Sequence, residues 1–164
     1  FYDNFETVRE VFELIADTTK IDIKDIIFHN PSDLLNQTQF TQLSIFCASI
    51  SIFKVLTQEI DIQKLNISCM MGHSLGEYTA LTAAEILSIE DCSLLLKKRG
   101  ELMQNAYPEN KSGMAAVIGL NSHSLEQIIK KRQIPITLDL SSLFRLYQIS
   151  RWGYLIASIR ISET

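Results

Sequence analysis

The sequence has no dense basic cluster, which bears on its partners. The net charge is −4, and no basic run is stronger than Lys130-Lys131-Arg132. Proteins that bind nucleic acid need a positive surface to neutralise phosphates, so we expect no nucleic-acid partner. Hydrophobic residues make up 46% and charged residues 21% of the chain, which is ordinary for a globular protein. A length of 164 residues allows one domain with a sizeable core.

Paired cysteines and long apolar runs are also missing. Cys47, Cys69 and Cys92 are scattered, form no Cys-x-x-Cys pair and are odd in number. This pattern favours reduced, buried thiols in the cytoplasm. No run of about 18 continuous apolar residues indicates a membrane span, and no signal peptide is visible. We therefore expect a cytoplasmic protein that makes no use of a membrane.

Apolar residues recur at helical spacing in several segments and form short continuous runs in two others. The patterns predict helices over residues 3–16, 38–56, 76–87, 88–106 and 121–132, and strands over residues 65–71 and 113–120. The segment 38–56 is apolar nearly all round, which is typical of a buried helix. Asp3 or Asn4 would cap the first helix, and Ser88 with Asp91 matches a capping box. The alternation predicts an α/β fold with a parallel sheet and flanking helices.

A serine lies between two glycines in the run Gly72-His73-Ser74-Leu75-Gly76, after a predicted strand and before a predicted helix. This context is typical of a nucleophile elbow, a tight turn that strains the serine backbone and lifts its hydroxyl clear of the sheet. Side chains at the two flanking positions would collide with the strand and the helix, which glycine avoids. The N–H of Leu75 would lie at a helix N-terminus, where it can stabilise an oxyanion. Ser74 is therefore a candidate nucleophile, and the alternative is a structural turn that arose by chance.

No base for this serine is evident, although a serine hydroxyl needs one within about 2.6–3.2 Å to become a good nucleophile. The chain has three histidines. His73 adjoins Ser74 on a sharp turn and should project away from it, so we expect it to line the site without acting as the base. His29 in an early loop and His123 at the start of a late helix are expected to be surface or capping residues.

Three segments together resemble one enzyme family. GHSLGEYTAL, LLLKKRGELMQNA and GMAAVIGL are similar to segments of the malonyl-CoA:acyl carrier protein transacylases of bacterial fatty acid synthesis. The resemblance covers residues 1–120 and extends to residue 132. It implies that residues 1–110 are part of an α/β-hydrolase-like acyltransferase core without its first strand. Residues 111–132 would begin a small ferredoxin-like subdomain.

The resemblance implies a role for each matching residue. Ser74 matches the nucleophile that carries the acyl group as an ester, and Leu75 matches the residue whose backbone N–H forms half of the oxyanion hole. Arg99, 25 positions after Ser74, matches the arginine that holds the malonyl carboxylate. A guanidinium suits that role because it binds a carboxylate through two parallel hydrogen bonds. Gln42 matches a glutamine near the site, although the two residues after it differ from the family's Pro-Ala.

The reaction implied is a ping-pong acyl transfer. Ser74 would take the malonyl group from malonyl-CoA, and the phosphopantetheine thiol of the acyl carrier protein would then take it from Ser74. The resemblance implies neither a metal nor a cofactor. It also implies a monomer for the full-length enzyme.

Several family elements have no counterpart in this chain. The opening strand and its Gly-Gln-Gly-Ser-Gln loop, which supplies the second oxyanion donor, should precede Phe1. The catalytic histidine and the glutamine that orients it belong to the second half of the family's chain. Because loss of one oxyanion donor costs about 10²–10³ in rate and loss of the base costs nearly as much as loss of the nucleophile, we expect little or no activity from the chain as given. An unpaired sheet edge would also make it aggregation-prone.

Residues 133–164 form a tail that matches nothing in the family. The tail has clumps of apolar residues but no sustained helical or alternating period. One hypothesis is that this segment is read out of frame.

Two other functions stay open on the sequence. The chain could be a non-catalytic remnant that binds acyl carrier protein or CoA, in which case Ser74 and Arg99 matter little. It could also be another serine acyl enzyme, such as the acyltransferase module of a polyketide synthase or an esterase. Arg99 favours an acyl group that carries a carboxylate, which a plain esterase would not need. Acceptance of methylmalonyl groups is not decided by the sequence.

Overall fold

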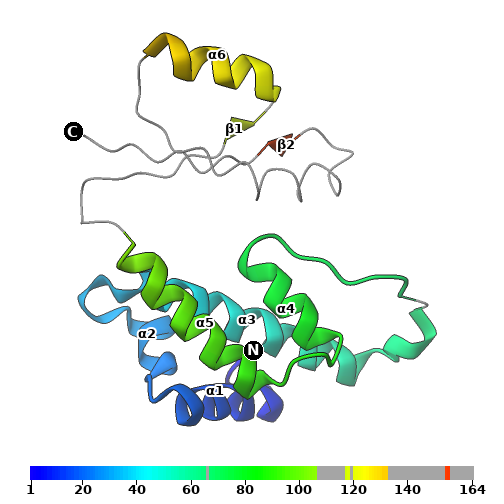
Figure 1. Cartoon of the computed structure of the whole chain (residues 1–164). Helices are drawn as coiled ribbons and strands as arrows, with labels where there is room; N and C mark the ends of the chain where they lie inside the picture. The colour runs from blue at the N-terminus through cyan, green and yellow to red at the C-terminus, as the bar shows by residue number, and fades with distance from the viewer. Residues whose placement is uncertain (66, 107–116, 119, 133–153, 156–164) are drawn as a thin grey trace. The chain divides into compact units, whose positions relative to one another are not determined.

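The computed structural model of the chain describes residues 1–65, 67–106, 117–118, 120–132 and 154–155 (Figure 1). The chain divides into two compact units, Phe1–Ala106 and Tyr107–Thr164. Most of the predicted strand over residues 113–120 and nearly all of the tail 133–164 lie outside the described residues.

The first unit is helical. Its elements are α1 (Glu6–Thr19), α2 (Ile23–His29), α3 (Thr38–Glu59), α4 (Leu75–Ala83) and α5 (Ile89–Gln104), with the short 3-10 helices η1 (Pro31–Asn36) and η2 (Ile62–Leu65). The long helix α3 contacts α1, α4 and α5, and α1 also contacts α5. The helix that follows Ser74 and the helix that carries Arg99 therefore both pack on α3.

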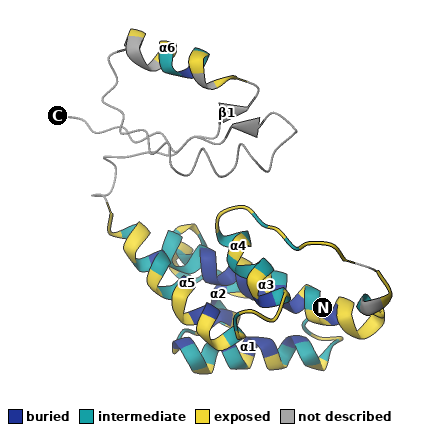
Figure 2. Ribbon diagram, turned by 45° about the vertical axis from the view of Figure 1, so that its right-hand side comes forward, coloured by how far each residue is buried: buried dark blue, intermediate teal, exposed yellow. Residues whose placement is uncertain are grey.

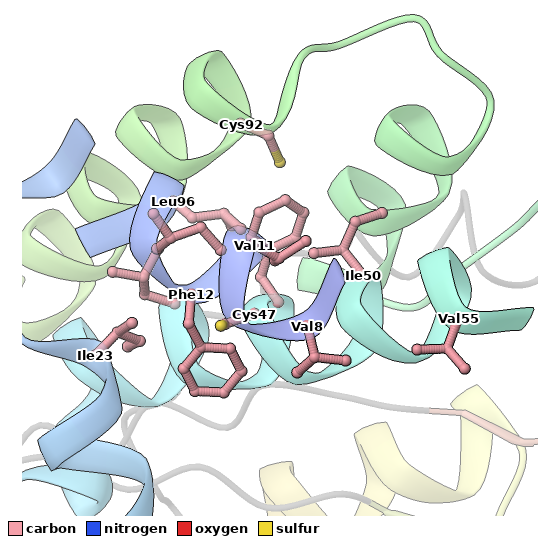
Figure 3. Packing of buried hydrophobic residues seen from close by; sticks show 12 residues of the cluster. Val8, Val11, Phe12, Ile23, Cys47, Ile50, Val55, Cys92 and Leu96 are labelled. Atoms are coloured by element: carbon pink, nitrogen blue, oxygen red, sulfur yellow. The ribbon is translucent and has the colours of Figure 1, made fainter. Parts of the chain in front are cut away.

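The core lies where α1, α3 and α5 meet (Figure 3). Each helix contributes apolar residues at helical spacing, as the sequence predicts for 3–16 and 38–56. The fully or nearly fully buried side chains include Val8, Val11, Phe12, Ile15, Leu43, Phe46, Cys47, Ile50, Cys92 and Leu96. Burial of each large apolar side chain contributes about 1.5–3 kcal/mol, so this cluster is what fixes α5 against α3.

One face of α3 is not covered in the first unit. Ile45, Ile52 and Leu56 are 47%, 52% and 42% exposed. By length and composition alone, α3 is apolar enough to cross a membrane, with a mean hydropathy of 1.5 over its best window. We expected no helix that could span a membrane, because serines interrupt the apolar runs of the sequence. These serines leave the mean hydropathy of α3 high, so the helix passes a test that the continuous runs do not. Its packing against α1, α2, α4 and α5 is that of a core helix, and core helices commonly pass the same test.

The helix termini confirm one predicted cap and contradict another. The Ser88 hydroxyl accepts a hydrogen bond from the N–H of Asp91 at 3.0 Å and caps α5, as predicted. Neither Asp3 nor Asn4 caps α1, whose first flanking residue is Phe5 without a side-chain hydrogen bond. That prediction is wrong because the N–H groups of Asn4 and Phe5 both bond to the carbonyl of Phe1, which places the helix start one turn later.

The helix after the serine is shorter than the predicted range 76–87. It ends at Ala83 because Glu85 adopts the left-handed conformation, with φ 60°. The N–H of Ile86 bonds to the carbonyl of Leu81 at 2.9 Å, and the N–H of Glu85 bonds to that of Thr82 at 3.0 Å. These two bonds form a Schellman motif, which ends a helix without needing proline.

The predicted parallel sheet is not formed among the described residues. Residues 67–71, predicted as a strand, make no β-bridge there. A strand needs a second strand to satisfy its N–H and C=O groups, and the described part of the first unit offers only helices. In Figure 2 the segment between η2 and α4 is exposed over most of its length.

The second unit has one short antiparallel strand pair and one helix within its described residues. β1 (Val117–Ile118) pairs antiparallel with β2 (Tyr154–Leu155), with Val117 opposite Leu155. The helix α6 (Ser122–Arg132) confirms the helix predicted over 121–132. The side chain of Asn121 caps it by accepting from the N–H of Ser124 at 2.8 Å.

Candidate active site

Ser74 lies at the sharp turn that leads into α4. Its backbone has φ 56° and ψ −111°, a conformation that a residue with a side chain adopts only at an energetic cost. Such strain is what the nucleophile-elbow pattern predicts for its serine. The side chain of Ser74 is exposed, so the turn presents the hydroxyl outward.

The two glycines of the elbow are not equivalent. A Cβ at Gly72 would overlap the backbone carbonyl group of Gly76, so this position admits only glycine. A Cβ at Gly76 would meet nothing within 4 Å in the described part of the chain. The prediction that both flanking glycines avoid a collision is therefore confirmed for Gly72 and wrong for Gly76.

Arg99 reaches the serine from α5. Its Nη2 donates a hydrogen bond to the Oγ of Ser74 at 2.9 Å, across 25 residues of sequence. The guanidinium also lies over the ring of Tyr78, with 5.7 Å from Cζ to the ring centroid. The packing of α4 and α5 on α3 thus brings the candidate nucleophile and the candidate carboxylate-binding residue into direct contact.

Gln42 joins the same cluster from α3. Its Oε1 accepts a hydrogen bond from Nη1 of Arg99, and its Nε2 donates to the Sδ of Met103 at 3.2 Å. Gln42 is 5% exposed, whereas the guanidinium is only partly buried. Tyr78 and Met103 were not among the residues predicted for the site. Their spacing could have indicated them. Tyr78 follows Ser74 by four residues, and Met103 follows Arg99 by four residues, which is about one helical turn in each case.

Leu75 is the first residue of α4. Its N–H is one of the N-terminal groups that lack a partner inside the helix, and the helix dipole adds partial positive charge there. The neighbouring N–H groups of Gly76 and Glu77 are bonded to the carbonyls of His73 and Ser74, at 2.8 and 3.2 Å. An oxyanion donor at Leu75 is therefore compatible with the turn.

The histidines of the first unit do not contact the serine hydroxyl. His29, on α2, pairs with the Oδ1 of Asp25 at 2.9 Å, and its side chain is 69% exposed. His73 is exposed beside Ser74 and lines a cavity of about 540 Å³ between α3, the elbow and α4, which neither Ser74 nor Arg99 lines. In the second unit, His123 is exposed and pairs with the amide of Gln127 at 2.9 Å. Both His29 and His123 are thus surface residues, as expected.

The three thiols differ in environment. Cys47 and Cys92 are buried, as expected, whereas Cys69 is exposed in the segment before the elbow. Burial raises the pKa of Cys47 to about 12 and also raises the pKa of Cys92. Within the described residues, no three His, Cys, Asp or Glu side chains lie close enough to hold a metal ion.

The chain is similar to known acyltransferases over most of its length. The family model for acyl transferase domains matches residues 4–137. A malonyl CoA-acyl carrier protein transacylase of Staphylococcus aureus (strain MRSA252) is 36% identical over 129 residues, which cover 79% of this chain and 40% of that protein. The enzyme of that name from Haemophilus influenzae is 34% identical, with 79% and 41% covered. This chain therefore spans about 40% of the length of these relatives.

Solved structures give the same result. A malonyl CoA-acyl carrier protein transacylase from Clostridium perfringens has a TM-score of 0.72 and 30% identity, covering 98% of this chain and 48% of that chain. An acyl-carrier-protein S-malonyltransferase from Bartonella henselae has a TM-score of 0.74 and 28% identity, covering 98% and 56%. The strained serine turn, its arginine partner and these matches lead to one assignment: the chain belongs to the acyl transferase domain family.

Proposed function

We propose that this chain supplies the nucleophile and the carboxylate-binding arginine of a malonyl-CoA:acyl carrier protein transacylase. The observation that carries the proposal is the 2.9 Å contact between Arg99 Nη2 and Ser74 Oγ. A nucleophile for a thioester and a cation for a carboxylate must lie near each other to act on one malonyl thioester, because only one methylene separates its two reacting groups. The names of the relatives support the same substrates.

The roles follow from the chemistry of each group. Ser74 Oγ attacks the thioester carbonyl carbon of malonyl-CoA, the C–S bond breaks, and CoA leaves as a thiol with the proton from Ser74. The backbone N–H of Leu75 stabilises the oxyanion that forms in between. The phosphopantetheine thiol of the acyl carrier protein then attacks the seryl ester, and Ser74 regains its proton. Arg99 holds the malonyl carboxylate through both steps.

The finer features of the fold are part of the proposal. We expect residues 67–71 to be a strand of a parallel sheet when flanking strands are present. The exposed apolar face of α3, with Ile45, Ile52 and Leu56, supports this because such a face packs well under a sheet. The acyltransferase core over 1–110, the start of a ferredoxin-like subdomain over 111–132, a monomeric state and a cytoplasmic location are proposed from the resemblance to the transacylase family.

The first test asks whether Ser74 becomes acylated. The full-length protein that contains this chain is incubated with malonyl-CoA, digested and searched by mass spectrometry for a malonyl ester on the peptide that contains Ser74. Holo acyl carrier protein is then added, and malonyl-acyl carrier protein is measured. An ester that forms on Ser74, is absent in Ser74→Ala and disappears when the carrier protein is added supports the proposal.

Arg99→Ala provides the second half of the test. Hydrogen bonds to a charged group are worth about 1.5–3 kcal/mol, so this variant should lose about 10- to 100-fold in malonyl transfer. Lys98→Ala is the matched control, because Lys98 is the adjacent cation and points to Glu101 at the surface, 3.7 Å away. It should keep its activity. Binding of malonyl-CoA without any ester on Ser74 would instead favour the non-catalytic remnant.

A further inference from the structure

Gln42 is the largest of the polar residues that α3 buries, the others being Ser44 and Ser51. It is 5% exposed, between Thr41 and the fully buried Leu43 on α3. A buried amide without partners costs about 1–3 kcal/mol. Both ends of this amide are paired, one with Arg99 and the other with Met103. The surroundings of residue 42 therefore match an amide, with a donor facing its oxygen and an acceptor facing its nitrogen.

The two neighbours impose the same orientation on the amide. A guanidinium has only donors, so the Oε1 of Gln42 must face Arg99. The thioether of Met103 is only an acceptor, so the NH₂ group must face Sδ, at 3.2 Å. The amide cannot flip without losing both contacts. Met103 thus holds Gln42 in the orientation in which its oxygen receives Nη1 of Arg99.

The guanidinium is in turn held from three sides. Gln42 accepts a hydrogen bond from Nη1, Ser74 accepts one from Nη2, and the ring of Tyr78 lies beneath Cζ. A free arginine side chain loses about 1.5–2 kcal/mol of rotamer entropy when it becomes fixed. Because Gln42 fixes Arg99 before any ligand is present, a carboxylate that binds Arg99 need not order it.

We propose that Gln42 is a positioning residue that fixes the guanidinium of Arg99 and thereby favours acyl groups carrying a carboxylate. This proposal rests on the proposed function. Gln42 acts through Arg99 and does not itself touch the reacting atoms. Its effect should therefore fall on substrates that use the guanidinium and spare those that do not.

The variant Gln42→Leu removes both hydrogen bonds at similar volume, and Met103→Leu removes only the acceptor that orients the amide. Each variant of the full-length protein that contains this chain is assayed with malonyl-CoA and with acetyl-CoA. For Gln42→Leu we expect kcat/KM with malonyl-CoA to fall about 10-fold or more and that with acetyl-CoA to stay within about threefold. Met103→Leu should fall in the same direction by a smaller factor. Equal losses with both substrates would indicate a merely structural role and overturn the proposal.

Gln42→Glu separates positioning from charge. Its carboxylate can still accept from Nη1 and hold the guanidinium, but it neutralises the charge that the substrate carboxylate needs. We expect KM for malonyl-CoA to rise while the value for acetyl-CoA changes little. Ser44→Ala is the control, because Ser44 is buried two residues away and its hydroxyl has no hydrogen-bond partner among the described residues. It should leave both substrates unaffected.

A readout without turnover keeps this proposal distinct from the proposed function. Side-chain NMR of the arginines reports how fast the guanidinium of Arg99 rotates about its Cζ–Nη bonds. Slow rotation in the wild type and in Ser44→Ala, but fast rotation in Gln42→Leu, supports the positioning role even if neither CoA ester is turned over. Identical rotation in all three overturns it, whatever the enzyme assay shows. Absence of turnover with the expected NMR change would count against the proposed function alone.

Discussion

Gly100 on α5 lies close against the backbone of α3, and replacing it tests the packing that brings Arg99 to the site. Gly100 is buried within α5. A Cβ at this position would lie 2.7 Å from the Cα of Gln39, 3.0 Å from its carbonyl oxygen and 3.2 Å from its carbonyl carbon. All three are backbone atoms of α3. Gly100→Ala can therefore be accommodated only if one helix moves away from the other.

Two effects of this substitution have opposite signs. Alanine favours a helix interior over glycine by about 1 kcal/mol. Carbon atoms pack best at about 3.5–4.0 Å, so the helices must separate by about 1 Å. Overpacking of this kind costs about 1–3 kcal/mol, and contact with rigid backbone places this case at the upper end. We expect the free energy of unfolding to fall by about 1–2 kcal/mol.

The assay is urea unfolding followed by circular dichroism. With an m-value of about 2 kcal/mol/M, the midpoint for Gly100→Ala should fall by roughly 0.5–1 M. Gly76→Ala is the matched control, because it makes the same chemical change in a helix where the new methyl group meets nothing. A Gly100→Ala midpoint at or above that of the wild type would mean that helix propensity dominates. The close approach of α3 and α5 would then be refuted.

Three further predictions concern the cap of α5 and the thiols. Ser88→Ala removes the hydroxyl that accepts from the N–H of Asp91 and should cost about 1 kcal/mol in urea unfolding. A maleimide at pH 8 should label the exposed Cys69 first and the buried Cys47 only on unfolding, as peptide mass spectrometry can check. Because burial raises the pKa of Cys47 from 9.0 to about 12, the native state keeps a proton that the unfolded chain releases. The free energy of unfolding should therefore fall as the pH rises from 9 toward 12, by up to about 1.4 kcal/mol per pH unit, and Cys47→Ala should reduce this slope.

Local patterns predicted the helices well because each depends on neighbouring residues. The apolar spacing of 38–56 corresponds to α3, and Ser88 caps α5 as its side chain and its place before an apolar run indicate. Two predicted helix boundaries were wrong, the start of α1 and the end of α4, because backbone turns that no residue type marks set them. Phe5 precedes α1 because residues 1–5 form a turn of their own, in which the N–H groups of Asn4 and Phe5 bond to the carbonyl of Phe1. Glu85 ends α4 in a left-handed conformation that glutamate does not signal.

The candidate site was only partly predictable. Ser74 was found from a motif, whereas Arg99 and Gln42 were found from the resemblance to the transacylase family. Their contact could not be derived from the sequence, because it depends on how closely α5 approaches α3 at Gly100. Met103 was not predicted, because a methionine in an amphipathic helix is more often a packing residue than a hydrogen-bond acceptor.

The elbow glycines provide a last prediction, and it separates the sequence argument from the structural one. The motif alone indicates that Gly72 and Gly76 are equally necessary. In the structure, a methyl group at Gly72 overlaps the carbonyl of Gly76, whereas one at Gly76 is free of contacts among the described residues. Gly72→Ala should therefore open the turn, while Gly76→Ala should leave it intact.

Amide hydrogen exchange measures this difference directly. The N–H of Gly76 bonds to the carbonyl of His73 at 2.8 Å, and that of Glu77 bonds to the carbonyl of Ser74 at 3.2 Å. Both bonds belong to the first turn of α4, so their protection reports whether the strained serine turn persists. In Gly72→Ala both amides should exchange faster, and in Gly76→Ala the amide of residue 77 should keep its protection. Equal loss in the two variants would show that the second glycine is required for a reason outside these contacts. Strands packed over the elbow would be one such reason, because a methyl group at residue 76 would then have neighbours.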